Sequence, residues 1–285
     1  MSITSVRVSR RTKGGSTSGV PPLIAINTLV FDVSGSTASM GDAPAEQLHS
    51  LLHKFQEDAR ANDSNIQVSL HVFSDSISQV IPNNQDDYSV DMRTFVIPSM
   101  VIILEMLCPR GCTALYDAGI MGYDHVEKTY EREFAKLSPK VRALKPYISK
   151  CYVLATDGMD NRSTHTISDF KTHTLEAKEK GIMPLFLFAN IGSEMGKKMG
   201  FKQHNAAKFM PTYAGVSNML RATTTVLRQV SSGQTHTIDT QSMTQDIDPV
   251  SPPINPVDPT DYSTTAPTIP MPAVFGTRPP LLRRY

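Results

Sequence analysis

Four short apolar runs recur along the middle of the chain and predict strands. They are Leu23–Phe31, Ile66–Phe73, Cys151–Ala155 and Met183–Ala189. Runs of this length, rich in β-branched and aromatic residues, are typical of strands that are buried on both faces of a sheet. The segment SDSISQVI, which follows Phe73, is compatible with a short edge strand.

Between these runs, apolar residues recur every three or four positions and predict amphipathic helices. The helical segments are Glu46–Ala61, Leu115–Leu137, Ile167–Lys180 and Val216–Val230. We expect Asp42 to cap the first helix and Gly181 to end the third. Residues 89–107 are less regular: Thr94–Ile97 is a candidate strand, and a helix is expected from Ser99.

Strands that alternate with helices predict an α/β fold. We expect a Rossmann-like three-layer sandwich, with a mostly parallel central sheet and helices on both faces. In such sheets, ligands bind outside the carboxyl ends of the strands. The residues that directly follow each apolar run are therefore the first candidates for chemistry.

Composition divides the 285-residue chain into three parts. Residues 1–22 form a basic arm rich in glycine and serine, which we expect to be flexible. Residues 23–232 carry the periodic pattern and form one domain, and residues 233–285 form a Pro/Ser/Thr-rich tail. Half of the prolines lie in this tail, and such a composition favours extended, polyproline-like conformations over a packed core.

The tail ends in FGTRPPLLRRY, where apolar and basic side chains follow a long polar stretch. This ending indicates an arm that docks on a neighbouring subunit, and a free end is the alternative. The expected anchors are Phe275, Leu281, Leu282 and Tyr285.

The formal net charge of +1 argues against bulk attraction to nucleic acid or to a membrane surface. No apolar run approaches the length of about 18 residues that a membrane span needs, and the N-terminus lacks the apolar core of a secretory signal. Three cysteines are too few for a disulfide framework and indicate a reducing compartment. We expect the protein to act in the cytoplasm or within a virion or other large complex. An organellar transit peptide is the weaker interpretation of the basic N-terminus.

Small oxygen-bearing side chains gather where strands are predicted to end. In TLVFDVSGSTASMGD, Asp32 ends the first apolar run, and Ser34 and Ser36 follow it. CPRGCTALYDA places Thr113 just before a helix, and VLATDGMDN places Asp157 after another strand. Donors that are all oxygen suit a hard cation such as Mg²⁺ or Mn²⁺. We expect the five side chains to meet at one edge of the sheet.

The motifs DVSGS, Gly-x-Thr-Ala before a helix and TDG after a strand resemble the metal-ion-dependent adhesion site of von Willebrand factor A domains. The resemblance extends over residues 23–232, with the motifs in the order that the family has. It implies Mg²⁺ or Mn²⁺ held by Asp32, Ser34, Ser36, Thr113 and Asp157. The hydroxyls would bind the ion directly, the aspartates partly through water, and one position would remain for a partner's carboxylate. Asp160 and Asn161 are expected to shape the last loop.

The resemblance implies a non-enzymatic module that captures an acidic protein partner, through Glu or Asp, by way of the cation. The alternative is an architectural subunit of a large assembly, such as a minor virus capsid protein, with the fold as a block and the arms as staples. Two further interpretations are a simple helix cap and an intact motif without metal. No Walker loop, Gly-x-Gly-x-x-Gly or Gly-x-Ser-x-Gly motif occurs, so we expect no catalysis. The near-neutral net charge is the reason why no nucleic-acid ligand is expected.

Other chemical groups suggest less. His49 and His53 lie one helical turn apart and could bind zinc, but no third ligand is evident, which favours an exposed pair. Cys108 and Cys112 could be half of a metal site, although buried or inert thiols are favoured. Four methionines are expected to fill the core: Met100, Met106, Met121 and Met210.

Overall fold

The computed structural model describes residues 22–84, 87–192 and 194–234. The arm predicted for residues 1–22 and the tail predicted for residues 233–285 lie outside this part of the chain, apart from Pro22, Gly233 and Gln234. Both therefore remain predictions, as do the tail anchors.

The described residues form a 7-stranded sheet in the order β3-β2-β1-β5-β6-β7, with β4 also paired to β2. The strands are β1 (Ile24–Asp32), β2 (Asn65–Phe73), β3 (Ile77–Ile81), β4 (Val90–Asp91), β5 (Ile148–Thr156), β6 (Ile182–Phe188) and β7 (Ala206–Lys208). β3 and β4 run antiparallel to β2, and the other pairings are parallel. The predicted α/β fold with a mostly parallel sheet is confirmed, as is the short edge strand.

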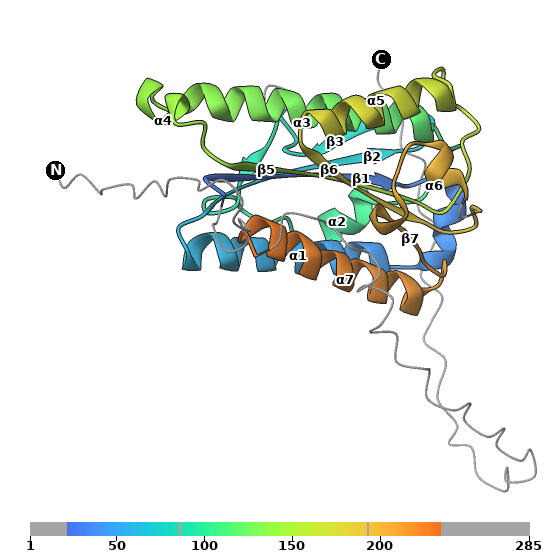
Figure 1. The fold of residues 1–285 in the computed structure, drawn as a ribbon. Coiled ribbons are helices and arrows are strands. Elements are labelled where there is room, and N and C mark those ends of the chain that lie inside the picture. Colours follow the sequence, from blue (N-terminus) through green and yellow to red (C-terminus); the bar gives the residue numbers. More distant parts are fainter. Residues whose placement is uncertain (1–21, 85–86, 193, 235–285) are drawn as a thin grey trace, which may run out of the picture. The chain divides into compact units, whose positions relative to one another are not determined.

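Helices cover both faces of the sheet, as Figure 1 shows. One layer contains α1 (Ala43–Ala61), α2 (Met100–Met106) and α7 (Tyr213–Ser231). The opposite layer contains α3 (Leu115–Lys136) and α5 (Ile167–Glu179). Short helical turns connect these elements: η1 (Gly35–Met40), α4 (Pro139–Ala143), α6 (Glu194–Lys198) and η2 (Gln203–Asn205). None of the helices in the described ranges combines the length and apolarity that crossing a membrane requires.

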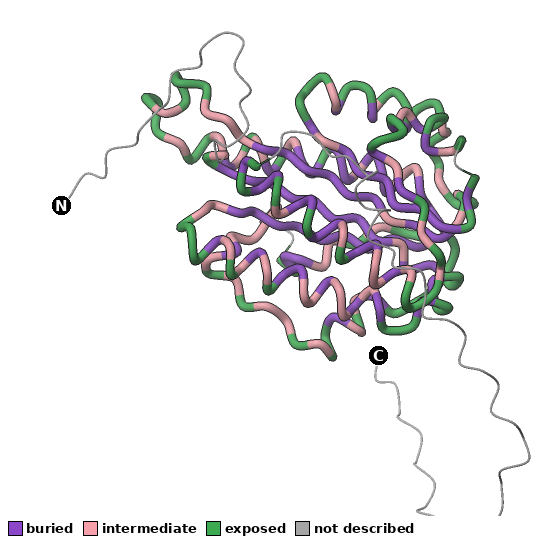
Figure 2. Tube along the Cα trace, turned by 60° about the horizontal axis from the view of Figure 1, so that its bottom comes forward, coloured by how far each residue is buried: buried purple, intermediate pink, exposed green. Residues whose placement is uncertain are grey.

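The central strands are buried on both sides, so their side chains pack alternately into two separate hydrophobic cores. In β1, Leu29 and Phe31 pack with residues of α1 and α7, whereas Ile26 and Val30 pack with residues of α3 and α5. Figure 2 shows the buried strands between half-exposed helices. Burial on both faces is the reason why these strands appear in the sequence as continuous apolar runs rather than as alternating ones.

Several local predictions need correction. Thr94–Ile97 is not a strand: the N–H of Phe95 donates to the Asp91 carbonyl in a turn, and the Gln56 side chain donates to the Phe95 carbonyl. Asp42 precedes α1 as predicted, but its side chain makes no capping hydrogen bond because its backbone is already helical, with φ −83° and ψ −4°.

Two side-chain predictions also differ from the structure. Met210 is 65% exposed in the loop before α7, whereas the other three methionines are at least partly covered. Cys108 and Cys112 are exposed free thiols, and only Cys151 is buried. The helix expected from Ser99 is present as α2, and Gly181 lies just beyond the end of α5 as predicted, with a φ of 77°.

Candidate functional site

The carboxyl ends of β1 and β5 bring the first and last predicted site residues together. The two strands are parallel neighbours, with Phe31 opposite Ala155 at the end of the register. Asp32 is the last residue of β1, and Asp157 directly follows β5. Because parallel strands end at the same edge, both carboxylates face the loops that follow them.

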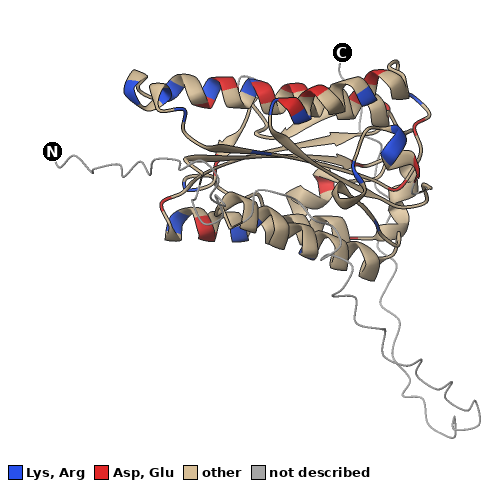
Figure 3. Cartoon of the chain, viewed as in Figure 1, with Lys and Arg blue, Asp and Glu red and all other residues tan. Residues whose placement is uncertain are grey.

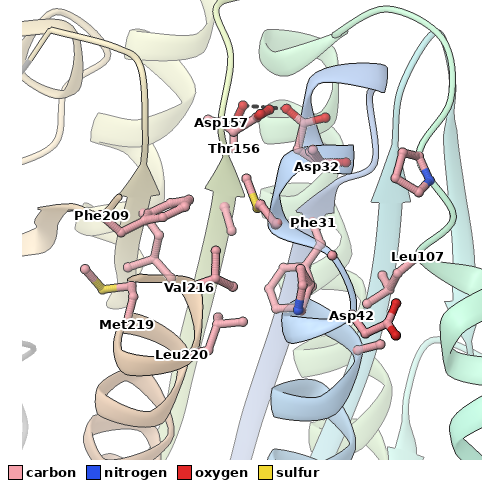
Figure 4. A pocket seen from close by; sticks show the side chains of 18 of the residues that line it. Phe31, Asp32, Asp42, Leu107, Thr156, Asp157, Phe209, Val216, Met219 and Leu220 are labelled. Carbon is pink, nitrogen blue, oxygen red and sulfur yellow. Dashed lines mark hydrogen bonds between the residues drawn. The ribbon is translucent and has the colours of Figure 1, made fainter. Parts of the chain in front are cut away.

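Both oxygens of Asp32 are fixed by hydrogen bonds. The Ser34 N–H donates to Oδ1 over 2.7 Å, and the Thr156 hydroxyl donates to Oδ2 over 2.6 Å. Figure 4 shows the second of these bonds at one end of a cavity. Burial raises the pKa of Asp32 in spite of these donors, and the nearby Asp157 carboxylate adds to the rise. The site therefore disfavours the negative charge that a bound cation would stabilise.

A chain of oxygens leads from the first loop to Asp157. The hydroxyls of Ser34 and Ser36 lie 3.1 Å apart, and the Ser36 hydroxyl donates to Asp157 Oδ1 over 2.7 Å. Asp157 is 1% exposed, and its Oδ2 is buried without a hydrogen-bond partner. Burial raises the pKa of Asp157 above its usual value. A buried carboxylate oxygen without a partner is costly, and a ligand at this point would offset that cost.

Thr113 reaches the same place from the loop between α2 and α3. Its N–H donates to Asn161 Oδ1 over 2.8 Å, and the Asn161 N–H donates back to the Thr113 carbonyl over 3.0 Å. A methyl group added to Gly158 would lie 3.6 Å from the Thr113 hydroxyl and 3.7 Å from the Ser36 hydroxyl. The two hydroxyls therefore flank one point beside Asp157.

Backbone hydrogen bonds join the first two loops of the site. The Arg110 N–H donates to the Val33 carbonyl over 2.7 Å, and the Gly35 N–H donates to the Gly111 carbonyl over 3.2 Å. The main chain thus holds the loop that carries Ser34 and Ser36 (the serine loop) against the loop that carries Thr113 (the threonine loop), independently of any ligand.

Asp75 supports the threonine loop, and sequence reasoning missed it. Gly111 has φ +67°, and a Cβ there would lie 2.1 Å from Asp75 Oδ2. The Cys112 N–H donates to Asp75 Oδ1 over 3.1 Å. Asp75 follows the end of β2, and the strand-end rule that identified Asp32 could have identified it.

The third loop is fixed against the start of α3, as predicted for Asp160 and Asn161. The Ser163 hydroxyl donates to Asp160 Oδ1 over 2.5 Å and accepts the N–H groups of Tyr116 and Asp117. Thr156, which precedes Asp157 in the TDG motif, is a second residue that the sequence prediction left out. Its hydroxyl links Asp32 to the third loop, because it also accepts the Gly158 N–H.

The structure thus brings all the predicted site residues to one edge of the sheet. The donor set is two carboxylates and three hydroxyls: Asp32, Ser34, Ser36, Thr113 and Asp157. Within the described ranges, no group of three or more His, Cys, Asp or Glu side chains is arranged so that it could hold a metal ion, and this site contributes only two carboxylates. Oxygen donors and an unpartnered carboxylate oxygen fit a hard divalent cation.

A cavity of about 310 Å³ extends from this edge between α1, α7 and the sheet. Asp32, Thr156 and Asp157 form its polar end, as Figure 4 shows. The remainder is lined mostly by apolar side chains, including Phe31, Leu107, Phe209, Val216, Met219 and Leu220, with Thr37 and Asp42 as further polar members. The carboxylates are buried at the polar end of a largely apolar cavity, and this burial agrees with their raised pKa values.

Charges elsewhere on the surface are mixed. Figure 3 shows acidic and basic side chains interspersed along α3 and α5. Such interspersed charges produce no field of a single sign along these helices.

No protein-family model matches the sequence, and no curated protein matches it either. Solved structures do match. A von Willebrand factor type A protein from Catenulispora acidiphila aligns with a TM-score of 0.50 and 11% identity, over 74% of this chain and 46% of that one. The pilus adhesin SpaC from Lactobacillus rhamnosus GG, in an open conformation, aligns with a TM-score of 0.50 and 15% identity, over 75% and 31%.

A third solved structure is proximal thread matrix protein 1 from the mussel byssus, with a zinc-occupied MIDAS motif. It aligns with a TM-score of 0.42 and 13% identity, over 75% of this chain and 46% of that one. The chain therefore spans less than half of each of these proteins. At such identities the likeness concerns the fold alone, and the described chain has a von Willebrand factor A-like fold.

Proposed function

We propose that this protein is a non-enzymatic protein-binding module that captures an acidic partner through a divalent cation. The cation, Mg²⁺ or Mn²⁺, would be held by Asp32, Ser34, Ser36, Thr113 and Asp157. It would offer an open coordination position to a Glu or Asp carboxylate of the partner. The observation that carries the proposal is the buried Asp157 Oδ2, which has no hydrogen-bond partner although it lies beside the serine and threonine hydroxyls.

The hydroxyl content of the site supports capture of an anion. Neutral hydroxyls neutralise less of a cation's charge than carboxylates do, so an ion held by few carboxylates keeps a strong attraction for another one. The two aspartates are also largely buried, and electrostatic attraction is less screened away from water. Both features favour a contact between the ion and a partner's carboxylate.

The fold supports a binding role in a general way, because its rigid strands position the three loops. The sequence offers no nucleophile or nucleotide motif that would add catalysis. The proposal therefore includes no reaction step.

The test is selection of peptides from a random display library by the purified full chain. The selection has three arms: the original protein in Mg²⁺, the original protein in EDTA, and the Asp157→Ala variant in Mg²⁺. We expect enrichment of peptides with a required Asp or Glu, lost in EDTA and in the variant. Replacing the required Glu by Gln should abolish binding. Peptides that bind equally well in EDTA would contradict capture through a metal ion.

A second experiment addresses the architectural alternative. That alternative depends on the terminal arms, which lie outside the described residues. It predicts that assembly with neighbouring subunits survives EDTA and is lost when residues 233–285 are removed. Capture through a metal ion predicts instead that partner binding is lost in EDTA and survives the removal of residues 233–285.

A further inference from the structure

Helix α1 carries a pair of histidine rings whose nitrogen donors differ in chemistry from the oxygen donors of the site at the sheet edge. His49 and His53 are four residues apart, so both side chains project from the same face of the helix. Their rings meet edge to face, with centroids 4.5 Å apart. The two Nε2 atoms lie 3.2 Å from each other.

This separation matches that of two ligands of one metal ion. Imidazole nitrogens bind Zn²⁺ at about 2.0–2.1 Å, which places two nitrogens of a tetrahedral site about 3.3 Å apart. Because the two Nε2 atoms already lie 3.2 Å apart, rotation of the two side chains could turn both nitrogens toward one ion. The alternative is a single N–H···N hydrogen bond between the rings, which needs one ring as donor and the other as acceptor.

The helix that carries the pair is firmly anchored. Its opposite face buries Leu48, Leu51, Leu52 and Phe55 in the core. His53 is exposed and His49 is partly exposed, so an ion can enter from solvent without disturbing the fold. A rigid backbone and open access both favour binding, because little order has to be created when the ion arrives.

We propose that His49 and His53 form a second metal site, specific for borderline transition-metal ions such as Zn²⁺. Two nitrogen ligands suit Zn²⁺, Ni²⁺ or Cu²⁺, whereas the oxygen donors at the sheet edge suit Mg²⁺ or Mn²⁺. A four-coordinate ion bound here would keep two positions for water or for an outside donor. The proposal goes beyond the adhesion-like site and does not depend on it.

The test measures Zn²⁺ binding to the untagged full chain by equilibrium dialysis. Millimolar Mg²⁺ and an Asp157→Asn background keep Zn²⁺ from the sheet-edge site. In this background we expect one saturable Zn²⁺ site. His49→Gln or His53→Gln should weaken binding by at least about tenfold, because even the loss of an outer-shell partner costs about 10–100-fold in metal affinity. His53→Cys, which keeps a zinc ligand, should retain most of the affinity.

The matched control is His204→Gln, which alters an exposed histidine on η2 and should leave Zn²⁺ binding unchanged. Circular dichroism of each variant establishes that the fold is retained. Absence of saturable Zn²⁺ binding in the background protein would overturn the proposal. So would binding that survives both glutamine variants and is lost in Cys108→Ser, since the exposed thiols would then hold the ion.

Discussion

The Ser36 hydroxyl donates a 2.7 Å hydrogen bond to Asp157 Oδ1, although 121 positions separate the two residues in the chain. Ser36 lies in the helical turn η1 that follows β1, and Asp157 lies in the loop after β5. The bond joins the first loop of the site to the third, and the second oxygen of Asp157 is left without a partner. This incomplete pairing is the physical basis of the proposed cation site.

Replacing Asp157 by asparagine should have opposite effects with and without metal. Without metal, Asp157→Asn should raise the free energy of unfolding by about 1 kcal/mol, because a buried and incompletely paired charge is removed. With Mg²⁺ at 100 times its Kd, the original protein should gain about 2.7 kcal/mol, and the variant should gain nothing. Thermal melts in EDTA and in Mg²⁺ measure both effects.

The control for this experiment is Asp124→Asn, an exposed change on α3 that should alter neither melt. An Mg²⁺-dependent rise that persists in Asp157→Asn would contradict the assignment of Asp157 as a ligand.

Asn161→Ala should loosen the threonine loop. The change removes the acceptor of the Thr113 N–H, and the net loss of one such hydrogen bond costs about 1 kcal/mol. We expect a slightly less stable protein with a clearly weaker response to Mg²⁺, measured by titrating the melting temperature. Arg162→Ala, the exposed neighbour, is the matched control. An unchanged Mg²⁺ affinity in Asn161→Ala would show that the loop needs no such support.

Gly111→Ala should destabilise the fold through two separable effects. The positive φ of 67° costs a residue with a side chain about 1–2 kcal/mol, and the new methyl would meet Asp75 Oδ2 at 2.1 Å. Urea denaturation of Gly111→Ala, with and without Asp75→Ala, separates the backbone cost from the clash. If the single substitution left stability unchanged, the described conformation of this loop would be wrong.

His71 should make the protein sensitive to acid. Its ring is 2% exposed on β2, neither nitrogen has a hydrogen-bond partner, and burial lowers its pKa from 6.5 to about 3. Between these two values the unfolded chain binds a proton that the folded chain does not. The free energy of unfolding therefore falls as the pH falls through this window, by up to about 1.4 kcal/mol per pH unit.

The check is urea denaturation of the original protein and of His71→Phe at pH 7 and at pH 5. The phenylalanine variant should lose less stability on acidification, because its ring takes up no proton. His204→Phe, at an exposed position, should behave like the original protein. An identical loss in His71→Phe would mean that other groups account for the acid sensitivity.

The main strands and helices could be predicted because burial determines the local pattern of apolar residues along the chain. β1, β2, β5 and β6 are apolar throughout, since both of their faces are covered. β7 was missed because Ala206–Lys208 is only 3 residues long and contains no large apolar or β-branched side chain. The supporting residues were missed for another reason. The strand-end rule could have identified Asp75 as a candidate, but the bonds that Asp75 and Thr156 make reach across loops, so no spacing within the sequence indicates their supporting role.

The sequence by itself determined the strand–helix alternation, the edge of the sheet where chemistry should lie, and the five oxygen-bearing residues of the candidate site. Only the tertiary structure decided that these oxygens converge, that Asp157 keeps one of them without a partner, and that His49 and His53 turn their Nε2 atoms toward each other. The physical reason is that periodicity reflects burial, and the apolar or polar character of each residue already indicates whether it is buried. Distances between side chains depend on how strands are ordered and loops are joined, and these arise only when distant segments pack together.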